Sequence, residues 1–260
     1  MKKHKAMRKK ILILGGIKEA LECAYFFHDD PRFDLIYSLA GHVKPRKSYP
    51  FKVRDGGFGG EKPFANFIVD EKIDLILNAT HPFAENISAR CEAVSKKIGV
   101  KSIRFCRPAW QRTEEDQWAY YENVETAIKA LPNGHKCFLA LGTYDFTPHV
   151  KSQHLWLLSR SITKPNWLNQ ISNLYEGKHL IASPPYSLEN ERALLQKYEI
   201  DCLVTKNAGG MGAYAKLIAA RELRIKVHIV NQPIYKSKYL VHAKDEAIQT
   251  SHSVLGINFS

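Results

Sequence analysis

The residue types best suited to chemistry stand where apolar runs of the chain end. The first run stops at Gly15 and Gly16, followed by Ile17, and residues 18–29 then have helical periodicity. Glycine has no Cβ, so the backbone of such a turn approaches a ligand closely, and the free amide groups at the start of a helix bind phosphate. The turn therefore predicts a diphosphate site. The fingerprint G-x-G-x-x-G is absent, however, and a tight strand-to-helix turn without a ligand explains the stretch about equally well.

A second group of candidates follows the apolar run of residues 33–39. Its members are Ser38, Ala40, Gly41 and His42. In a dinucleotide-binding sheet the end of the second strand meets the adenosine ribose, and an acidic residue there binds a free 2′-hydroxyl group. This chain has no acid at that place, and Lys44 and Arg46 lie close to His42. The segment therefore favours a 2′-phosphate, and hence NADPH over NADH, with a solvated basic loop as the alternative.

The densest glycine cluster of the chain comes next. Gly56, Gly57, Gly59 and Gly60 surround Phe58. Such a loop allows close approach to a planar ligand or backbone with positive φ, and a merely flexible loop is the alternative. We expect a ligand-facing loop because the four glycines are so concentrated.

A polar triplet follows the apolar run of residues 73–78. Thr80, His81 and Pro82 place a hydroxyl group and an imidazole at the end of a buried strand. In a parallel sheet ligands collect beyond the carboxyl ends of the strands, so these side chains would border the cofactor. His81 is the candidate proton donor, although a lone histidine more often has a structural hydrogen-bonding role.

A similar turn stands in the second half of the chain. Lys206, Asn207 and Gly209 follow the apolar run that ends at Val204, and a helix-patterned segment begins soon after them. This turn could hold a carboxylate or phosphate, or it could be an ordinary connection with a surface lysine. The chain has no G-x-S-x-G elbow, no H-E-x-x-H motif and no Walker lysine motif.

The elements that would position these turns are strands and helices in regular alternation. Strand-like runs at residues 10–16, 33–41, 73–83 and 100–108 alternate with helical patterns at 18–29, 61–72 and 84–99, and a second alternating set covers 136–233. Short links between such elements imply parallel sheets covered on both faces, so the fold class is α/β. The polar, irregular stretch from Ala109 predicts a boundary between an N-terminal dinucleotide-binding domain, residues 1–108, and a C-terminal α/β domain, residues 109–260.

Composition narrows the class of protein. No apolar run approaches the roughly 20 residues of a membrane-spanning helix, and the basic start has too short an apolar stretch for a secretory signal. The five cysteines form no C-x-x-C pair, so we expect reduced core thiols, no metal site and a cytoplasmic protein. Half of the formal net charge of +12 comes from the first ten residues. We expect no nucleic-acid partner, because no recognised binding motif accompanies that charge.

Several motifs together resemble one family, the precorrin-6A reductases of cobalamin biosynthesis and their cobalt-precorrin-6A counterparts. They are ILILGGIKEA, SLAGH, VRDGGFGG, NATHPFA, RPAW, SLENERALL and VTKNAGGMGAYAKLIAARELRIKV, and they span nearly the whole chain. The order of GGFGG, ATHPFA and TKNAGG is the most specific part of the resemblance.

The resemblance implies two Rossmann-like domains with mainly parallel sheets and a cleft between them. It implies transfer of a hydride from NADPH to a double bond of the precorrin-6A macrocycle, giving precorrin-6B, with His81 as the proton-donor candidate. On the cofactor side it places Gly15, Gly16, Ile17, Ser38, Ala40, Gly41, His42, Thr80 and Pro82. On the substrate side it places Arg54, Gly57, Gly59, Lys206, Asn207 and Gly209. The tetrapyrrole carries many carboxylates, which suits a basic chain, and transient contact with other enzymes of the pathway is a further expectation.

The chain departs from the family pattern at several positions. Family members usually have threonine at Ile17, arginine at Leu21 and His42, G-R-Q at residues 142–144 and R-G-P at residues 183–185. The missing arginine at His42 weakens the argument for a 2′-phosphate unless Lys44 or Arg46 substitutes for it. The two missing arginines in the second half would lower substrate affinity unless other lysines compensate. Two other functions therefore stay open: a drifted homologue that binds nucleotide or tetrapyrrole without turnover, and an NAD(P)-dependent reductase of another substrate.

Overall fold

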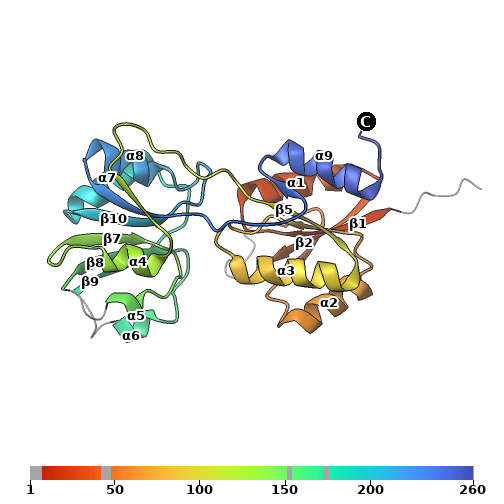
Figure 1. Ribbon diagram of the computed structural model, residues 1–260, viewed down its shortest axis with the longest axis horizontal. Coiled ribbons are helices and arrows are strands. Elements are labelled where there is room, and N and C mark those ends of the chain that lie inside the picture. Colours follow the sequence, from red (N-terminus) through yellow and green to blue (C-terminus); the bar gives the residue numbers. More distant parts are fainter. Residues whose placement is uncertain (1–7, 42–47, 151–153, 172–175, 260) are drawn as a thin grey trace, which may run out of the picture. The chain divides into compact units, whose positions relative to one another are not determined.

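The computed structural model describes residues 8–41, 48–150, 154–171 and 176–259. They form two compact α/β units (Figure 1). The first unit contains the described residues up to Arg107 together with those from Pro233 on, and the second runs from Pro108 to Gln232. Among the described residues, no helix combines the length and the hydrophobicity that crossing a bilayer requires.

The first unit is a six-stranded parallel sheet between two layers of helices. Its elements are β1 (Lys9–Leu14), α1 (Lys18–Asp29), β2 (Phe33–Leu39), β3 (Lys52–Asp55), α2 (Glu61–Asp70), β4 (Leu75–Asn78), α3 (Glu85–Ile98), β5 (Lys101–Phe105), β12 (Leu240–Val241) and α9 (Lys244–Leu255). The strand order is β3-β2-β1-β4-β5-β12, and every pairing is parallel. This is the order of the doubly wound dinucleotide-binding fold, in which the chain changes direction between β1 and β4.

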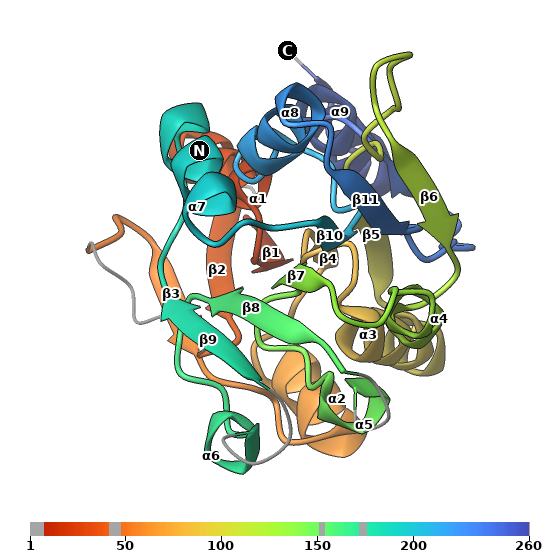
Figure 2. The same cartoon turned by 90° about the vertical axis from the view of Figure 1, so that its left-hand side faces the viewer.

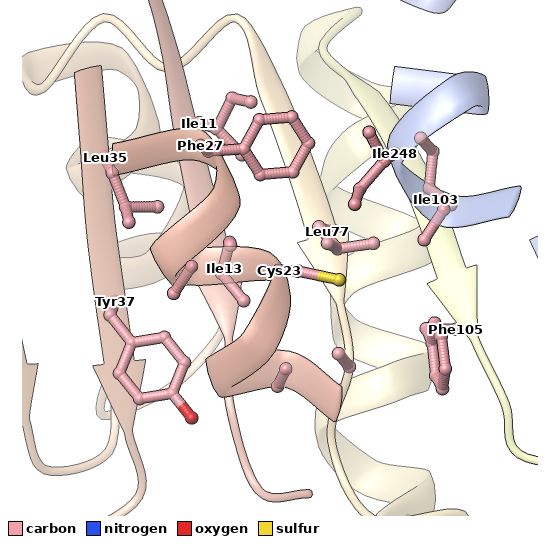
Figure 3. Packing of buried hydrophobic residues seen from close by; sticks show 14 of the residues in the cluster. Ile11, Ile13, Cys23, Phe27, Leu35, Tyr37, Leu77, Ile103, Phe105 and Ile248 are labelled. Carbon is pink, nitrogen blue, oxygen red and sulfur yellow. The ribbon is translucent and has the colours of Figure 1, made fainter. Parts of the chain in front are cut away.

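The side chains of successive β1 residues pack alternately on the two faces of this sheet. Ile11 and Ile13 pack with Phe27 of α1 and Ile248 of α9 on one face (Figure 3). Leu12 and Leu14 pack with residues of α2 and α3 on the other face. Because both faces are covered, β1 is a continuous apolar run rather than an alternating one.

The second unit repeats this architecture. Its elements are β6 (Trp118–Tyr121), α4 (Val124–Lys129), β7 (Lys136–Ala140), α5 (Thr147–Val150), β8 (Trp156–Ser161), α6 (Leu168–Ile171), β9 (Glu176–Ile181), α7 (Leu188–Lys197), β10 (Cys202–Lys206), α8 (Ala215–Glu222) and β11 (Lys226–Val230). The strand order is β9-β8-β7-β10-β11-β6, again all parallel (Figure 2). The change of direction here falls between β7 and β10. The expected α/β class with parallel sheets is therefore confirmed in both units.

The end of the chain departs from the expected domain boundaries. We expected residues 109–260 to form one C-terminal domain, but the segment from Pro233 on belongs to the first unit. There Leu240 and Val241 pair with Arg104 and Phe105 of β5, and α9 packs beside α1. The physical reason is burial: Val241 and Ile248 complete the core cluster over β1 and β5.

Candidate functional site

The turn after β1 lies against the ends of both neighbouring strands. The amide of Gly15 donates to the carbonyl oxygen of Ser38 at 2.8 Å. A Cβ on Gly15 would stand 2.5 Å from the ring of Tyr37, and one on Gly16 would stand 3.2 Å from the amide nitrogen of His81. Both positions therefore require glycine for close packing. The structure thus brings together the expected residues after β1, β2 and β4.

Helix α1 begins directly behind this turn without a side-chain cap. Ile17 is its N-cap residue and makes no side-chain capping hydrogen bond. The first amide groups of a helix have no partner within the helix and carry a partial positive charge. The start of this 12-residue helix therefore offers amide donors to an anion at the carboxyl edge of the sheet.

The loop after β2 approaches the glycine loop after β3. Ser38 is buried, whereas Ala40 and Gly41 are exposed. A Cβ on Gly41 would lie 3.3 Å from the Cα of Gly56, so the two loops touch through bare backbone. His42, Lys44 and Arg46, on which the choice of NADPH over NADH was based, lie outside the described residues.

Arg54 shapes the glycine loop from within. Its guanidinium donates to the carbonyl oxygens of Gly56 and Gly57 and stacks 3.8 Å from the ring centroid of Phe58. Burial lowers the pKa of this arginine. Gly57 and Gly59 are exposed, and a Cβ on either would meet no atom within 4 Å. Arg54 therefore holds the loop, and the exposed surface at Gly57 and Gly59 is backbone.

The triplet after β4 forms a tight turn with a fixed histidine. The Thr80 hydroxyl donates to Oδ1 of Asn78 at 2.8 Å, and Thr80 and Pro82 are buried. His81 is half-buried, and its Nδ1 accepts a hydrogen bond from the amide of Phe83 at 3.2 Å. A neutral His81 ring in this arrangement carries its proton on Nε2.

Arg104 of β5 is a member of this site that the sequence reasoning missed. It is 3% exposed, and its Nη1 lies 3.1–3.2 Å from four oxygens, the carbonyl and side-chain oxygens of Asn78 and Thr80. Its Nη2 reaches the carbonyl oxygen of His81 at 3.4 Å. The only signal in the sequence was a cation inside the apolar strand SIRF.

In the second unit the residues expected to meet the substrate follow β10. Lys206 is half-buried, with its Nζ 4.8 Å from the ring centroid of Tyr144 in the loop after β7. The Asn207 side chain is occupied by Trp110, because Oδ1 accepts from the Trp110 amide at 2.7 Å and Nδ2 donates to its carbonyl oxygen at 3.1 Å. Gly209 has a φ of +65°. Lys206 is therefore the charged group of this turn, and Asn207 shapes it.

Sequence reasoning also missed a buried charge cluster behind this turn. Arg160 and Glu191 form a two-pronged ion pair at 2.5 and 2.9 Å, with side chains 8% and 2% exposed. Lys216 is buried nearby, and its Nζ donates to the carbonyl oxygen of Ala213 at 2.6 Å. Burial, reinforced by Arg160, lowers the pKa of Lys216 to about 7. Glu191 and Lys216 stand in helix-patterned segments, where charges usually face solvent, and Arg160 stands in a strand-like run, so no pattern revealed the cluster.

Comparison with known proteins agrees with this arrangement. The family model described as precorrin-6x reductase CbiJ/CobK matches residues 10–252. A precorrin-6A reductase of a Sinorhizobium species is 37% identical, over 94% of this chain and 93% of its own length. A cobalt-precorrin-6A reductase of Methanocaldococcus jannaschii is 24% identical, over 86% of this chain and 90% of its own.

A solved structure extends the comparison to the fold. The structure titled CobK precorrin-6A reductase superposes with a TM-score of 0.85 at 29% identity and covers 96% of this chain and 98% of its own. The family model spans both units, including the returning C-terminal segment up to residue 252. The chain therefore belongs to the precorrin-6x reductase family, CbiJ/CobK.

Proposed function

We propose that this chain is a precorrin-6A reductase of cobalamin biosynthesis, which transfers a hydride from NADPH to a double bond of the macrocycle to give precorrin-6B. The observation that carries the proposal is the match over nearly the full length to a named precorrin-6A reductase at 37% identity. The strand order of the first unit supports it, because the candidate residues meet at the change of direction between β1 and β4, where such sheets bind dinucleotides.

The residues after β1, β2 and β4 fit a dinucleotide. Gly15 and Gly16 leave no side chain between the turn and a ligand, and the uncapped start of α1 would hold the diphosphate. Ser38 and Gly41 would hold the adenosine half, while the Thr80–Pro82 turn would border the nicotinamide. The bound cofactor supplies the hydride, and the chain supplies its orientation. The preference for the 2′-phosphate rests on residues 42–46 of the sequence.

His81 is the proton donor in this proposal. The hydrogen bond from the Phe83 amide to Nδ1 directs the ring proton to Nε2, and the ring is half-buried rather than fully enclosed. Loss of the Nε2 proton from a neutral ring would leave an imidazolate, so the proton that the hydride addition requires would come from the imidazolium form. In that form Nδ1 has taken a proton from solvent in place of the Phe83 hydrogen bond, and the ring returns to neutral when Nε2 delivers its proton to the macrocycle.

The substrate carboxylates would be met by positive charge in the second unit. Lys206 stands at the carboxyl edge of its sheet, stacked on Tyr144. Gly209, buried in the same turn, has a positive φ, and Asn207 keeps the turn in shape through Trp110. Long-range attraction by a chain of net charge +12 favours capture of such a polyanion.

The test has two stages. First, the protein is titrated with NADPH and with NADH, and nicotinamide fluorescence is followed; we expect tighter binding of NADPH. Second, NADPH and precorrin-6A, with and without cobalt, are mixed with the protein anaerobically and the NADPH absorbance is followed. We expect substrate-dependent oxidation that falls in K206M and H81Q. Binding of NADPH without any oxidation would contradict the proposed reaction and favour a homologue that binds without turnover.

A further inference from the structure

Arg104 lies directly beneath the Thr80–Pro82 turn and is a buried cation without a carboxylate partner among the described residues. The oxygens around its guanidinium belong to residues 78, 80 and 81, so the cation gathers successive groups of one short segment. A buried guanidinium needs such acceptors, because a charge without them is very costly away from water. The turn is therefore folded around Arg104.

Tyr235 closes the same arrangement from the other side. It lies on the returning segment between Pro233 and β12, and its ring is 4.3 Å from the Arg104 guanidinium carbon. Its hydroxyl donates to the carbonyl oxygen of Pro82 at 2.6 Å. Burial raises the pKa of Tyr235, which keeps the hydroxyl protonated as a donor at neutral pH. One side chain thus contacts both the cation and the turn.

We propose that Arg104 and Tyr235 are positioning residues that fix the Thr80–Pro82 turn in its nucleotide-binding shape. The inference rests on the proposed function, in which the turn borders the nicotinamide. The hydrogen bond from Tyr235 to Pro82 holds the end of the turn, and Arg104 holds its beginning and middle. Without the hydroxyl group the turn has other conformations open to it, and affinity falls in proportion to the fraction that keeps the binding shape.

The two halves of the first unit's sheet predict which ligands the positioning residues should affect. In a doubly wound sheet the half formed by β1, β2 and β3 binds the adenosine part, and the half that begins with β4 binds the other nucleotide. Arg104 and the Thr80–Pro82 turn belong to the second half. A loosened turn should therefore weaken the binding of NADPH, which uses both halves of the sheet, and leave the binding of 2′,5′-ADP, which uses only the first half, almost unchanged.

The experiment compares Tyr235→Phe with a matched control, Tyr239→Phe. Tyr239 lies on the same segment, and its hydroxyl has no hydrogen bond to another described residue. Dissociation constants for NADPH and 2′,5′-ADP are measured for both variants and the wild type, together with the melting temperature. We expect Y235F to bind NADPH about five- to tenfold more weakly, the loss typical of one hydrogen bond, with 2′,5′-ADP changed less than about twofold. Y239F should match the wild type for both.

Three results would overturn the proposal. They are equal NADPH affinities for Y235F and the wild type, an equal loss for NADPH and 2′,5′-ADP, and an equal loss in Y239F. Arg104→Lys serves as a second variant, because it keeps the charge but cannot reach the same set of oxygens, and we expect the same selective loss in the folded fraction. If the wild type itself binds neither nucleotide, the proposed function fails instead, so the two failures are distinguished.

Discussion

His228 makes the stability of the second unit sensitive to acid. It lies in β11, is 1% exposed, and stacks on Tyr121 with ring centroids 5.3 Å apart. Neither ring nitrogen has a hydrogen-bond partner among the described residues. Burial, reinforced by the positive charges of Lys226 and His135, lowers the pKa of His228 from its ordinary value of 6.5 to about 4. The folded chain therefore keeps this ring neutral at pH values where the unfolded chain protonates it.

The sign and size of the effect follow from proton linkage. Because the folded pKa lies below the unfolded one, the unfolded state binds more protons as the pH falls through 6.5, and the folded state loses stability until the pH approaches 4. At pH 5 the difference between the two pKa values corresponds to about 2 kcal/mol of lost unfolding free energy, and at pH 8 the loss is close to zero.

The assay compares the wild type with His228→Phe. Phenylalanine keeps the aromatic contact with Tyr121 and has no group to protonate. All four tryptophans lie in the second unit, so tryptophan fluorescence during urea unfolding reports on that unit. When the pH falls from 8 to 5, we expect the unfolding free energy of the wild type to decrease by about 2 kcal/mol more than that of H228F. Any strain from the larger ring is the same at both pH values and does not enter the difference.

His154, an exposed histidine of the same unit, provides the matched control. His154→Gln should lose as much stability as the wild type between the two pH values. Parallel losses in the wild type and H228F would refute the reasoning, since a neutral buried imidazole would then contribute no proton linkage.

Two further outcomes test the fold. Glu191→Leu leaves the buried guanidinium of Arg160 unpaired and should lower the unfolding free energy of the second unit by about 3–5 kcal/mol. Glu222→Gln removes one partner of an exposed ion pair and should lower it by less than about 1 kcal/mol. Urea unfolding followed by tryptophan fluorescence measures both changes. Deletion of residues 233–260 removes Ile248 and its neighbours from the first core and should unfold that unit, seen as fast amide exchange there, while tryptophan fluorescence stays native.

Much of the fold follows from sequence because its strands are buried on both faces. Runs such as ILIL and LIL are short and wholly apolar, and the helices between them have clear amphipathic periodicity. Residue types at helix ends also match their positions in the structure. Gly99 has a φ of +74° at the end of α3, and the Ser187 hydroxyl accepts the amide of Asn190 at the start of α7.

The missed elements depend on partners far away in the chain. Strand β12 has two residues and exists only because Leu240 and Val241 pair with β5. Strand β6 interrupts a stretch that reads as polar and irregular, and it is fixed by pairing with β11. Arg104 likewise looks out of place in its strand until Asn78 and Thr80 surround it. Periodicity describes neighbours along one segment, so it cannot reveal contacts of this kind.

The chain passes between its two units twice, at residues 107–108 and 232–233, and an aromatic residue close to each passage contacts both a buried cation and a turn. Tyr235 precedes β12 and covers Arg104 under the turn after β4. Trp110 precedes β6, lies 4.9 Å from the Nζ of Lys216, and donates from Nε1 to the carbonyl oxygen of Gly210 in the turn after β10. In each unit, an aromatic residue that precedes an edge strand of the sheet thus lies against a buried cation and hydrogen-bonds to a turn. Because Tyr235 donates to Pro82 and Trp110 donates to Gly210, a substitution at either aromatic residue should disturb the turn of its own unit.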